Sequence, residues 1–316
     1  MTGTNHPKAV SVWCLLLIIS SAGCARTTPP YSPPAFSPVT TPGRAPEPTA
    51  TLTASATASP MITLPGYPNI ILPDVERLRE IFREGTRQGM RAGVFSKVGD
   101  SITSNIYFMV PFGTADYDLG EYGYLQDVIE YYLRENAQEG NSFVHDSFAA
   151  RTSWRAEHVL DPARVRAPCE AGETPLLCEY RIVRPAAAVI LLGTNDAMSP
   201  TGSYEESMRR IVVLSLNRGI IPILTTLPDL LGRDVGPYNA VIRGLAADWD
   251  LPLIDLSSAL ASLPGKGLTP DGVHLSWLEP AVFEPPYLKY GMTVRNLLTL
   301  QALDAVWRSF PAGGDK

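Results

Sequence analysis

Two apolar runs, each ending in a glycine-led polar turn, constrain the fold of this chain most strongly. The mostly apolar run Val94–Val98 leads into a Gly-Asp-Ser turn at 99–101, and Ala188–Leu192 leads into a Gly-Thr-Asn-Asp turn at 193–196. Continuous apolar runs bounded by glycine are typical of strands buried in a parallel sheet. Open α/β sheets bind ligands outside the carboxyl ends of their strands. The polar residues of both turns are therefore candidate site residues, although such residues also serve as ordinary turn formers.

Helical and strand patterns alternate along the rest of the chain. Asp74 is the expected N-cap of the first helix, because an aspartate there can accept a hydrogen bond from the first turn. The expected helices are 75–90, 125–135, 152–160, 203–217, 238–249 and 289–310. The expected strands are the run at 94–98 and segments 142–148, 187–192, 220–227 and 251–256. This alternation predicts a three-layer, doubly wound α/β fold with a mostly parallel sheet of about five strands.

The N-terminus has the pattern of a secretory signal peptide within residues 1–24. Lys8 precedes an apolar run, Ala9–Ile19, and small residues lead to Cys24. Ala22-Gly23-Cys24 is similar to a bacterial lipobox, in which the cysteine is lipidated, although Ser21 stands where leucine or valine is usual. Lipidation at Cys24 with membrane anchorage, ordinary secretion and an uncleaved anchor all stay open. Each of these outcomes places the protein outside the cytoplasm.

Residues 25–63 are dominated by proline, threonine, serine and alanine. Such a segment cannot bury enough apolar surface to offset its ordering entropy, so we expect a disordered tether. The remaining segment, 64–316, is long enough for one α/β domain. The net charge is −6 and no basic block is present, so nucleic acid is not expected as a partner.

Of the four cysteines, Cys169 and Cys178 remain once Cys14 leaves with the signal peptide and Cys24 is set aside. An even pair at short separation, in a loop rich in proline and glycine, favours a disulfide in an oxidising compartment. The alternative is a metal pair, which would need further cysteine or histidine nearby.

Asp271 and His274 follow the last expected strand and precede the closing helix. A turn of this spacing lets Asp271 accept from one ring nitrogen of His274 while the other faces Ser101. Such a pair supplies the base and the orienting group that a serine nucleophile needs. Of the other histidines, His6 leaves with the signal peptide, His145 lies in a strand pattern and is expected to be structural, and His158 is expected to be solvated on a helix.

Gly-Asp-Ser, Gly-Thr-Asn-Asp and Asp-x-x-His in this order resemble the SGNH (GDSL-type) hydrolase superfamily, over residues 92–310. The resemblance implies a flavodoxin-like fold and an enzyme that needs no cofactor or metal, and the signal-peptide pattern makes it an extracytoplasmic bacterial member. It makes Ser101 the nucleophile, His274 the general base and Asp271 its partner. The Ser101 backbone N–H and the Asn195 side chain would line the oxyanion hole.

One feature of that family is missing. Its second motif supplies a glycine whose N–H completes the oxyanion hole, whereas segment 147–154 has no glycine. Ala150 is the expected substitute, because alanine keeps the N–H. A turn that required positive φ would disfavour alanine there.

Other chemistries lack their motifs, since the chain has neither H-E-x-x-H nor G-x-x-x-x-G-K. Aromatic residues gather in the loops that follow Ser101 and His274, where they form either a sugar- or acyl-binding rim or part of the core: Phe112, Tyr117, Tyr122, Tyr124, Trp277, Phe283 and Tyr287.

The expected function is a serine esterase that hydrolyses carboxylic esters, either O-acyl groups of glycans or lipid esters, through an acyl-enzyme. Two alternatives remain. One is an O-acyltransferase that acts on an envelope polysaccharide, and the other is a non-catalytic binding module that retains the fold.

Overall fold

The computed structural model describes residues 62–63, 67–198 and 200–310. The chain divides into two units, and all of these residues belong to the second, Leu52–Lys316. The expected signal peptide, Cys24 and nearly all of the expected tether lie outside the described residues. None of the helices in the described ranges combines the length and apolarity that crossing a bilayer requires.

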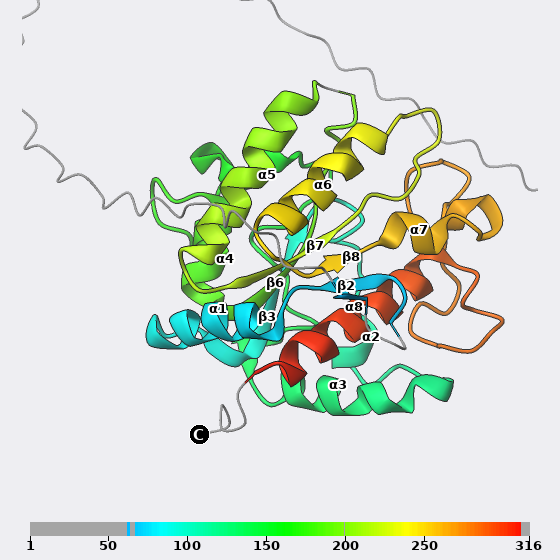
Figure 1. Cartoon of the computed structure of the whole chain (residues 1–316), viewed down its shortest axis with the longest axis horizontal. Helices are drawn as coiled ribbons and strands as arrows, with labels where there is room; N and C mark the ends of the chain where they lie inside the picture. Colours follow the sequence, from blue (N-terminus) through cyan, green and yellow to red (C-terminus); the bar gives the residue numbers. More distant parts are fainter. Residues whose placement is uncertain (1–61, 64–66, 199, 311–316) are drawn as a thin grey trace, which may run out of the picture. The chain divides into compact units, whose positions relative to one another are not determined.

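Strands and helices alternate through the domain (Figure 1). The strands are β1 (Ile62–Thr63), β2 (Ile70–Leu72), β3 (Arg91–Gly99), β4 (Asn136–Gln138), β5 (Gly140–Asn141), β6 (Pro185–Leu191), β7 (Ile221–Thr225) and β8 (Leu253–Ile254). The α-helices are α1 (Val75–Arg87), α2 (Val110–Gly113), α3 (Gln126–Leu133), α4 (Pro175–Val183), α5 (Thr201–Leu216), α6 (Gly236–Asp248), α7 (Leu256–Leu260) and α8 (Gly291–Arg308). Short 3₁₀ helices are η1 (Gly120–Leu125), η2 (Ala156–Leu160), η3 (Pro162–Arg164) and η4 (Pro264–Gly267).

The main sheet has the strand order β1-β2-β8-β7-β6-β3. Pairs β3–β6, β6–β7 and β7–β8 are parallel, whereas β1 and β2 add an antiparallel edge. Beyond β3, Ala150 forms a parallel bridge with Gly99. With this bridge counted as the second strand, the parallel strands follow the flavodoxin-like order 2-1-3-4-5. The expected doubly wound, mostly parallel sheet is confirmed, with an antiparallel edge that the sequence did not predict.

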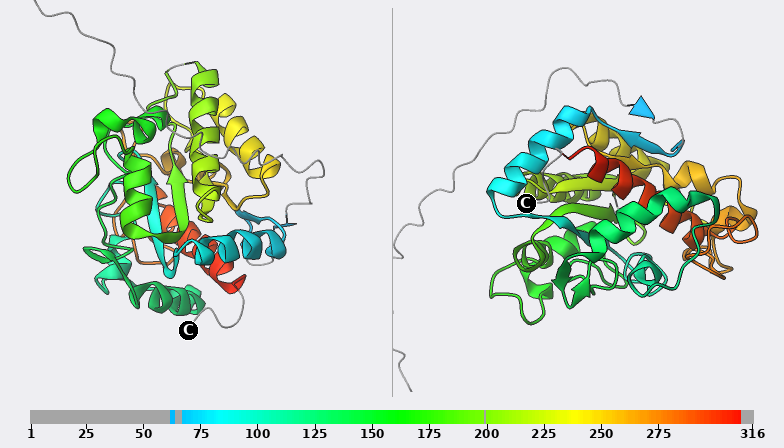
Figure 2. Two further views of the ribbon diagram at one scale, coloured as in Figure 1. Left: turned by 90° about the vertical axis from the view of Figure 1, so that its left-hand side faces the viewer. Right: turned by 90° about the horizontal axis from the view of Figure 1, so that it is seen from below.

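Helices cover both faces of the sheet. Figure 1 shows α4, α5 and α6 on one side and α1, α3 and α8 on the other. Figure 2 shows α8 lying between α1 and α3 in the view from below. The core lies between these layers and the sheet, where β6 and β7 are buried along their whole length. Strands buried on both faces explain the continuous apolar runs in the sequence.

The periodic elements form where the sequence predicted them. The Asp74 carboxylate accepts from the Glu76 N–H and caps α1, whose inner face buries Leu78, Ile81 and Phe82. The expected helices that correspond to α3, α5, α6 and α8 are present with ends shifted by a few residues.

The expected strand at 142–148 is wrong. The segment leaves the β4–β5 hairpin and satisfies its backbone through side chains instead of a strand ladder. The Asn141 side chain accepts from the Phe143 and Val144 N–H groups, and the Ser142 hydroxyl accepts from the Phe95 N–H. Side-chain bonds of this kind compete with regular secondary structure.

Two further expectations need correction. The expected helix at 152–160 is only the 3₁₀ helix η2, whose Ala156 N–H donates to the Asp196 carboxylate. The loop expected to hold both cysteines contains helix α4, so Cys178 is a buried helical residue. Thr174 caps α4 by accepting from the Leu177 N–H, and Pro175 stands at the first helical position, where its missing donor costs nothing.

Candidate active site

The topology brings the two polar turns together. Ser101 follows β3 and Asn195 follows β6, and Gly99 pairs with Leu191 at the ends of these adjacent parallel strands. After β3 the chain continues to Ala150, which lies beyond β3 at the outer edge of the sheet. After β6 the chain passes through α5 to β7, which lies on the other side of β6 from β3. The connections from these two adjacent strands therefore run in opposite directions. Such a switch point opens a crevice at the carboxyl ends of the strands. Both turns therefore lie at the strand ends where sheets of this order bind ligands.

Ser101, His274 and Asp271 form one hydrogen-bonded chain. The Ser101 Oγ lies 3.0 Å from the His274 Nε2, and the His274 Nδ1 lies 2.7 Å from the Asp271 Oδ2. The structure therefore joins a residue after β3 to the loop before α8. A hydroxyl, an imidazole and a carboxylate in this order have the geometry of an activated nucleophile.

The loop of Asp271 holds the carboxylate in place. Its Oδ1 accepts from the Thr269 hydroxyl at 2.7 Å, from the Val273 N–H at 2.8 Å and from the His274 N–H at 3.0 Å. Partial burial favours the neutral acid, but hydrogen bonds from Thr269 and His274 outweigh it and hold the pKa of Asp271 well below its usual range. The carboxylate therefore stays charged beside the imidazole. Thr269 was not expected from the sequence, where its position two residues before an aspartate in a turn is its only signal.

The Ser101 turn is held from both sides. The Asp100 carboxylate accepts from the Ile102 N–H at 2.9 Å, and burial raises the pKa of Asp100. A side chain at Gly99 would meet the Thr103 hydroxyl at 2.1 Å and the Leu191 carbonyl oxygen at 2.6 Å, so only glycine fits there. From α8, the Arg295 guanidinium donates to the Ile102 carbonyl oxygen and to the Thr103 hydroxyl. Arg295 was not singled out from the sequence.

Asn195 is oriented by the segment that carries Ala150. Its Nδ2 donates to the Trp154 carbonyl oxygen at 2.9 Å, which uses one of its two protons. The preceding residue, Thr194, is held by the Arg233 guanidinium, which donates to its carbonyl oxygen at 2.7 Å. The following residue, Asp196, is mostly buried, and burial raises its pKa to about 6. The second amide proton of Asn195 is left for another acceptor.

Ala150 does not adopt the conformation that favours glycine. It is absent from the described residues with positive φ, and it lies extended beside β3. The Gly99 N–H donates to the Ala149 carbonyl oxygen, and the Arg151 N–H donates to the Gly99 carbonyl oxygen. Because these bonds use the flanking peptide groups, the Ala150 N–H points away from β3. Alanine is therefore compatible with this backbone.

Two other histidines lie away from the triad. His145 is buried and its Nε2 lies 3.2 Å from the Glu179 Oε2, in line with a structural role. His158 was expected to be solvated, and this is wrong. Its Nδ1 accepts from the Arg155 N–H at 3.0 Å, its side chain is 16% exposed, and burial lowers its pKa.

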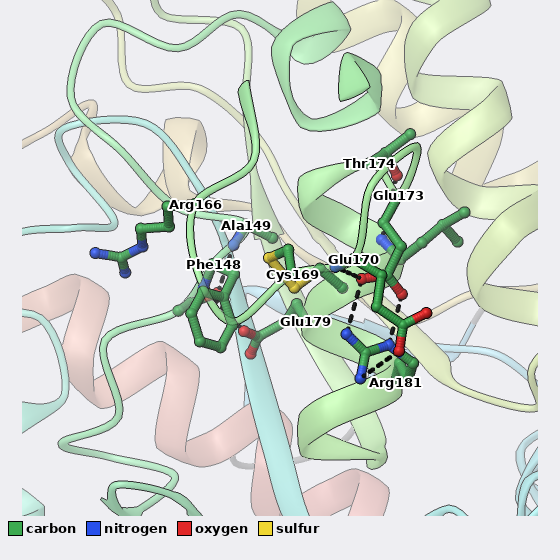
Figure 3. The surroundings of a disulfide bond; sticks show 12 residues. Phe148, Ala149, Arg166, Cys169, Glu170, Glu173, Thr174, Glu179 and Arg181 are labelled. Atoms are coloured by element: carbon green, nitrogen blue, oxygen red, sulfur yellow. Dashed lines mark hydrogen bonds and ion pairs between the residues drawn. A yellow bond between two sulfur atoms is a disulfide. The ribbon is translucent and has the colours of Figure 1, made fainter. Parts of the chain in front are cut away.

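The expected disulfide between Cys169 and Cys178 is present (Figure 3). Arg181 on α4 forms ion pairs with Glu170 and Glu173. The disulfide and these ion pairs both fix the loop before α4 to the helix. Within the described ranges, the group with metal-ligand proximity is Cys169, Glu173 and Cys178. Its sulfur atoms are bonded to each other and are not thiolate ligands.

The aromatic residues near the site divide into core and surface. Phe112 and Phe283 are fully buried and pack 5.8 Å apart between ring centroids, so these two belong to the core and not to a rim. Trp277 is partly exposed and packs on Tyr107, with ring centroids 4.0 Å apart. This pair joins the loop after Ser101 to the loop after His274.

No family model and no curated protein matches the sequence. Among solved structures, the chain is similar to a GDSL-like lipase from Bacteroides thetaiotaomicron, with 15% identity and a TM-score of 0.43 over 72% of this chain and 98% of that one. It is also similar to an acetylxylan esterase from Geobacillus stearothermophilus, with 15% identity and a TM-score of 0.44 over 68% of this chain and 94% of that one. Each is a likeness and gives no function to this chain.

Proposed function

We propose that this chain is a serine ester hydrolase of the SGNH type that acts through an acyl-enzyme. The observation that carries the proposal is the continuous hydrogen-bonded chain from the Ser101 Oγ through His274 to Asp271. Ser101 is distant in sequence from Asp271 and His274, yet its hydroxyl contacts the His274 ring. Ser101 directly follows β3, at the carboxyl end of a parallel strand, where open α/β sheets bind ligands, and this supports the proposal.

The proposed reaction has two stages. The Ser101 Oγ attacks the ester carbonyl carbon as the His274 Nε2 takes the hydroxyl proton, and that proton then passes to the departing alkoxide. Water attacks the acyl-serine in the same way and releases the carboxylic acid and Ser101. Asp271 accepts from the His274 Nδ1–H and stabilises the imidazolium that forms.

The proposed oxyanion hole contains three donors. They are the Ser101 N–H, the Ala150 N–H and the free amide proton of Asn195. Preorganised donors at this point act on charge that develops only in the transition state. The extended backbone at Ala150 and the Asn195–Trp154 bond support this assignment, because they leave one donor of each residue unused.

The test is hydrolysis of p-nitrophenyl acetate by the wild type and by Ser101→Ala. We expect the variant to lose the activity while its circular dichroism spectrum and melting temperature match the wild type. Near wild-type turnover by Ser101→Ala would disprove the assignment. Product analysis with O-acetylated glycans separates a hydrolase, which releases acetate, from an acyltransferase, which moves the acyl group to a sugar hydroxyl.

A further inference from the structure

A small cavity lies beside the proposed oxyanion hole but outside the triad. Its volume is about 170 Å³, and we call it the Lys97 cavity. Buried residues form its inner wall: Lys97, Thr103, His145, Ser147 and Ala150. Ser104, Ile106 and Asp146 are exposed and line its mouth, so the cavity opens to solvent. Ser104 and Ala150 connect it to the Ser101 turn and to the proposed oxyanion donor.

The Lys97 ammonium is a positively charged group of this inner wall, and no carboxylate of the described residues forms an ion pair with it. The Lys97 side chain is 6% exposed, and its Nζ donates to the Phe143 carbonyl oxygen at 2.7 Å. It forms no ion pair with any residue that the structure describes. Burial lowers its pKa to about 8, while Glu179 and Asp146 act in the opposite direction and Arg295 adds to the lowering. An ammonium group has three donors, and one acceptor leaves two of them unused.

The rest of the inner wall also offers donors. The Thr103 Oγ accepts from Arg295, and the Ser147 Oγ accepts from the Ala149 N–H, so the proton of each hydroxyl is free to donate. The Ala150 N–H belongs to the proposed oxyanion hole, so the donors of this wall are the two hydroxyls and the Lys97 ammonium. Arg295 does not line the cavity, but its buried guanidinium donates to the Thr103 hydroxyl from outside it and forms no ion pair within the described part of the chain, so it adds positive charge near this wall. An acceptor with negative charge would satisfy this set of groups.

The nearby carboxylates are already engaged. Asp146, at the mouth, pairs with Arg166 at 2.7 Å. Glu179 accepts from the Ser96 hydroxyl at 2.6 Å and from the Phe148 N–H at 2.9 Å, and it also contacts His145. Figure 3 shows Glu179 on α4 beside Phe148 and the disulfide. Neither carboxylate forms an ion pair with Lys97, so the charge of Lys97 is left for a ligand.

We propose that the Lys97 cavity is an anion-binding subsite that takes a carboxylate or phosphate substituent of the ester substrate. The proposal rests on the proposed function, because it assigns the substrate of the same site. It predicts that the enzyme prefers esters with an acidic group close to the scissile bond over neutral esters of the same size.

The first test measures binding without catalysis. The melting temperature is recorded in sodium formate and in sodium phosphate, each against sodium chloride of equal ionic strength. At ten times the dissociation constant, the wild type should gain about 3–6 °C. Lys97→Met should lose this gain, and Lys289→Met, which removes an exposed lysine outside the cavity, should keep it. Formate and phosphate together distinguish the two acidic groups.

A second variant tests the cavity in case Lys97→Met does not fold. Ser104→Leu keeps Lys97 and fills the mouth of the cavity from an exposed position, so it should also lose the anion effect. An equal gain in all four proteins, or no gain with either anion in the wild type, would overturn the subsite.

The second test measures selectivity. Two pairs of similar size place the charge on either side of the ester: 4-acetoxybenzamide with 4-acetoxybenzoate, and p-nitrophenyl pentanoate with p-nitrophenyl hemisuccinate. Lys97→Met should lower the charged-to-neutral ratio of kcat/KM by about tenfold or more in at least one pair. Unchanged ratios in an active enzyme would contradict the subsite alone. A wild type inactive on all four esters would contradict the proposed function, and the binding test would still decide the subsite.

Discussion

At the scale of single residues, the site combines groups of three kinds. In the proposed reaction, Ser101 and His274 carry the chemistry, and Asp271 and Asn195 orient or stabilise the reacting groups. Arg295 donates to the Ile102 carbonyl oxygen and so supports the Ser101 turn.

Asn195→Ala tests the proposed oxyanion hole. Removal of one oxyanion donor typically lowers kcat by about 10²–10³-fold, and KM should change little because the donor acts mainly in the transition state. Steady-state kinetics with p-nitrophenyl acetate measure both constants. An unchanged kcat, or a change confined to KM, would show that Asn195 serves only the turn.

The lowered pKa of Lys97 leads us to expect that the stability of the fold depends on pH. This pKa is about 8 in the folded chain, against a usual value of 10.5. Between these values the unfolded state binds more protons, so the free energy of unfolding rises with pH from about 8 to 10.5 and this contribution is lost as pH falls through 8. Urea titrations should show a rise of about 3 kcal/mol in the wild type relative to Lys97→Met over this window. Parallel curves would mean that Lys97 is not buried as a charged group.

At the scale of elements, helix α4 supports the segment that carries Ala150. The disulfide and the ion pairs of Arg181 fix the loop before α4, and Glu179 on α4 accepts from the Phe148 N–H two residues before Ala150. Support for Ala150 therefore comes from a helix that the sequence analysis did not predict.

Replacement of both Cys169 and Cys178 by alanine should destabilise the fold. The bridge closes a short loop, so the expected loss is at most about 3 kcal/mol in the free energy of unfolding. Urea denaturation of the double variant and the oxidised wild type measures the difference. Two free thiols in the protein exported by its native host would contradict the disulfide.

The elements that the sequence predicted are those with strong periodicity or continuous apolar runs. Strands β3 and β6 and helix α1 belong to this group, because the strands are buried in the sheet and α1 buries one face. The segment at 142–148 and helix α4 were missed, since their backbone groups depend on Asn141, Ser142 and the Thr174 cap. Such side-chain bonds leave little periodic signal.

The site was predictable where it lies in turns with a known order of polar residues. Ser101, Asn195, Asp271 and His274 were singled out in this way. Lys97 and Arg295 were not, because their importance arises from burial beneath the Ser101 turn, which depends on how β3 and α8 pack. The conformation of Ala150 likewise required the bridge to Gly99.

At the scale of the whole molecule, a domain with a disulfide follows an N-terminal stretch that lies outside the described residues. The disulfide is compatible with a domain outside the cytoplasm, because structural disulfides persist in oxidising compartments. The signal pattern before Cys24 and the segment rich in proline and threonine support a tethered domain.

Cys24→Ser tests the tether. If Cys24 is lipidated, the wild type should incorporate labelled palmitate and sediment with membranes, and the variant should do neither. Cleavage mapped away from the Gly23–Cys24 bond, or no label in the mature chain, would rule out the lipoprotein form.

The most direct measurement of the central claim is the mass of the protein after reaction with a fluorophosphonate probe. The probe phosphonylates a serine only where a base activates it, with loss of fluoride. We predict one adduct on wild-type protein, mapped to Ser101, none on Ser101→Ala, and strongly slowed labelling of His274→Ala. An unlabelled wild type, or an adduct that persists in Ser101→Ala, would contradict the nucleophile assignment.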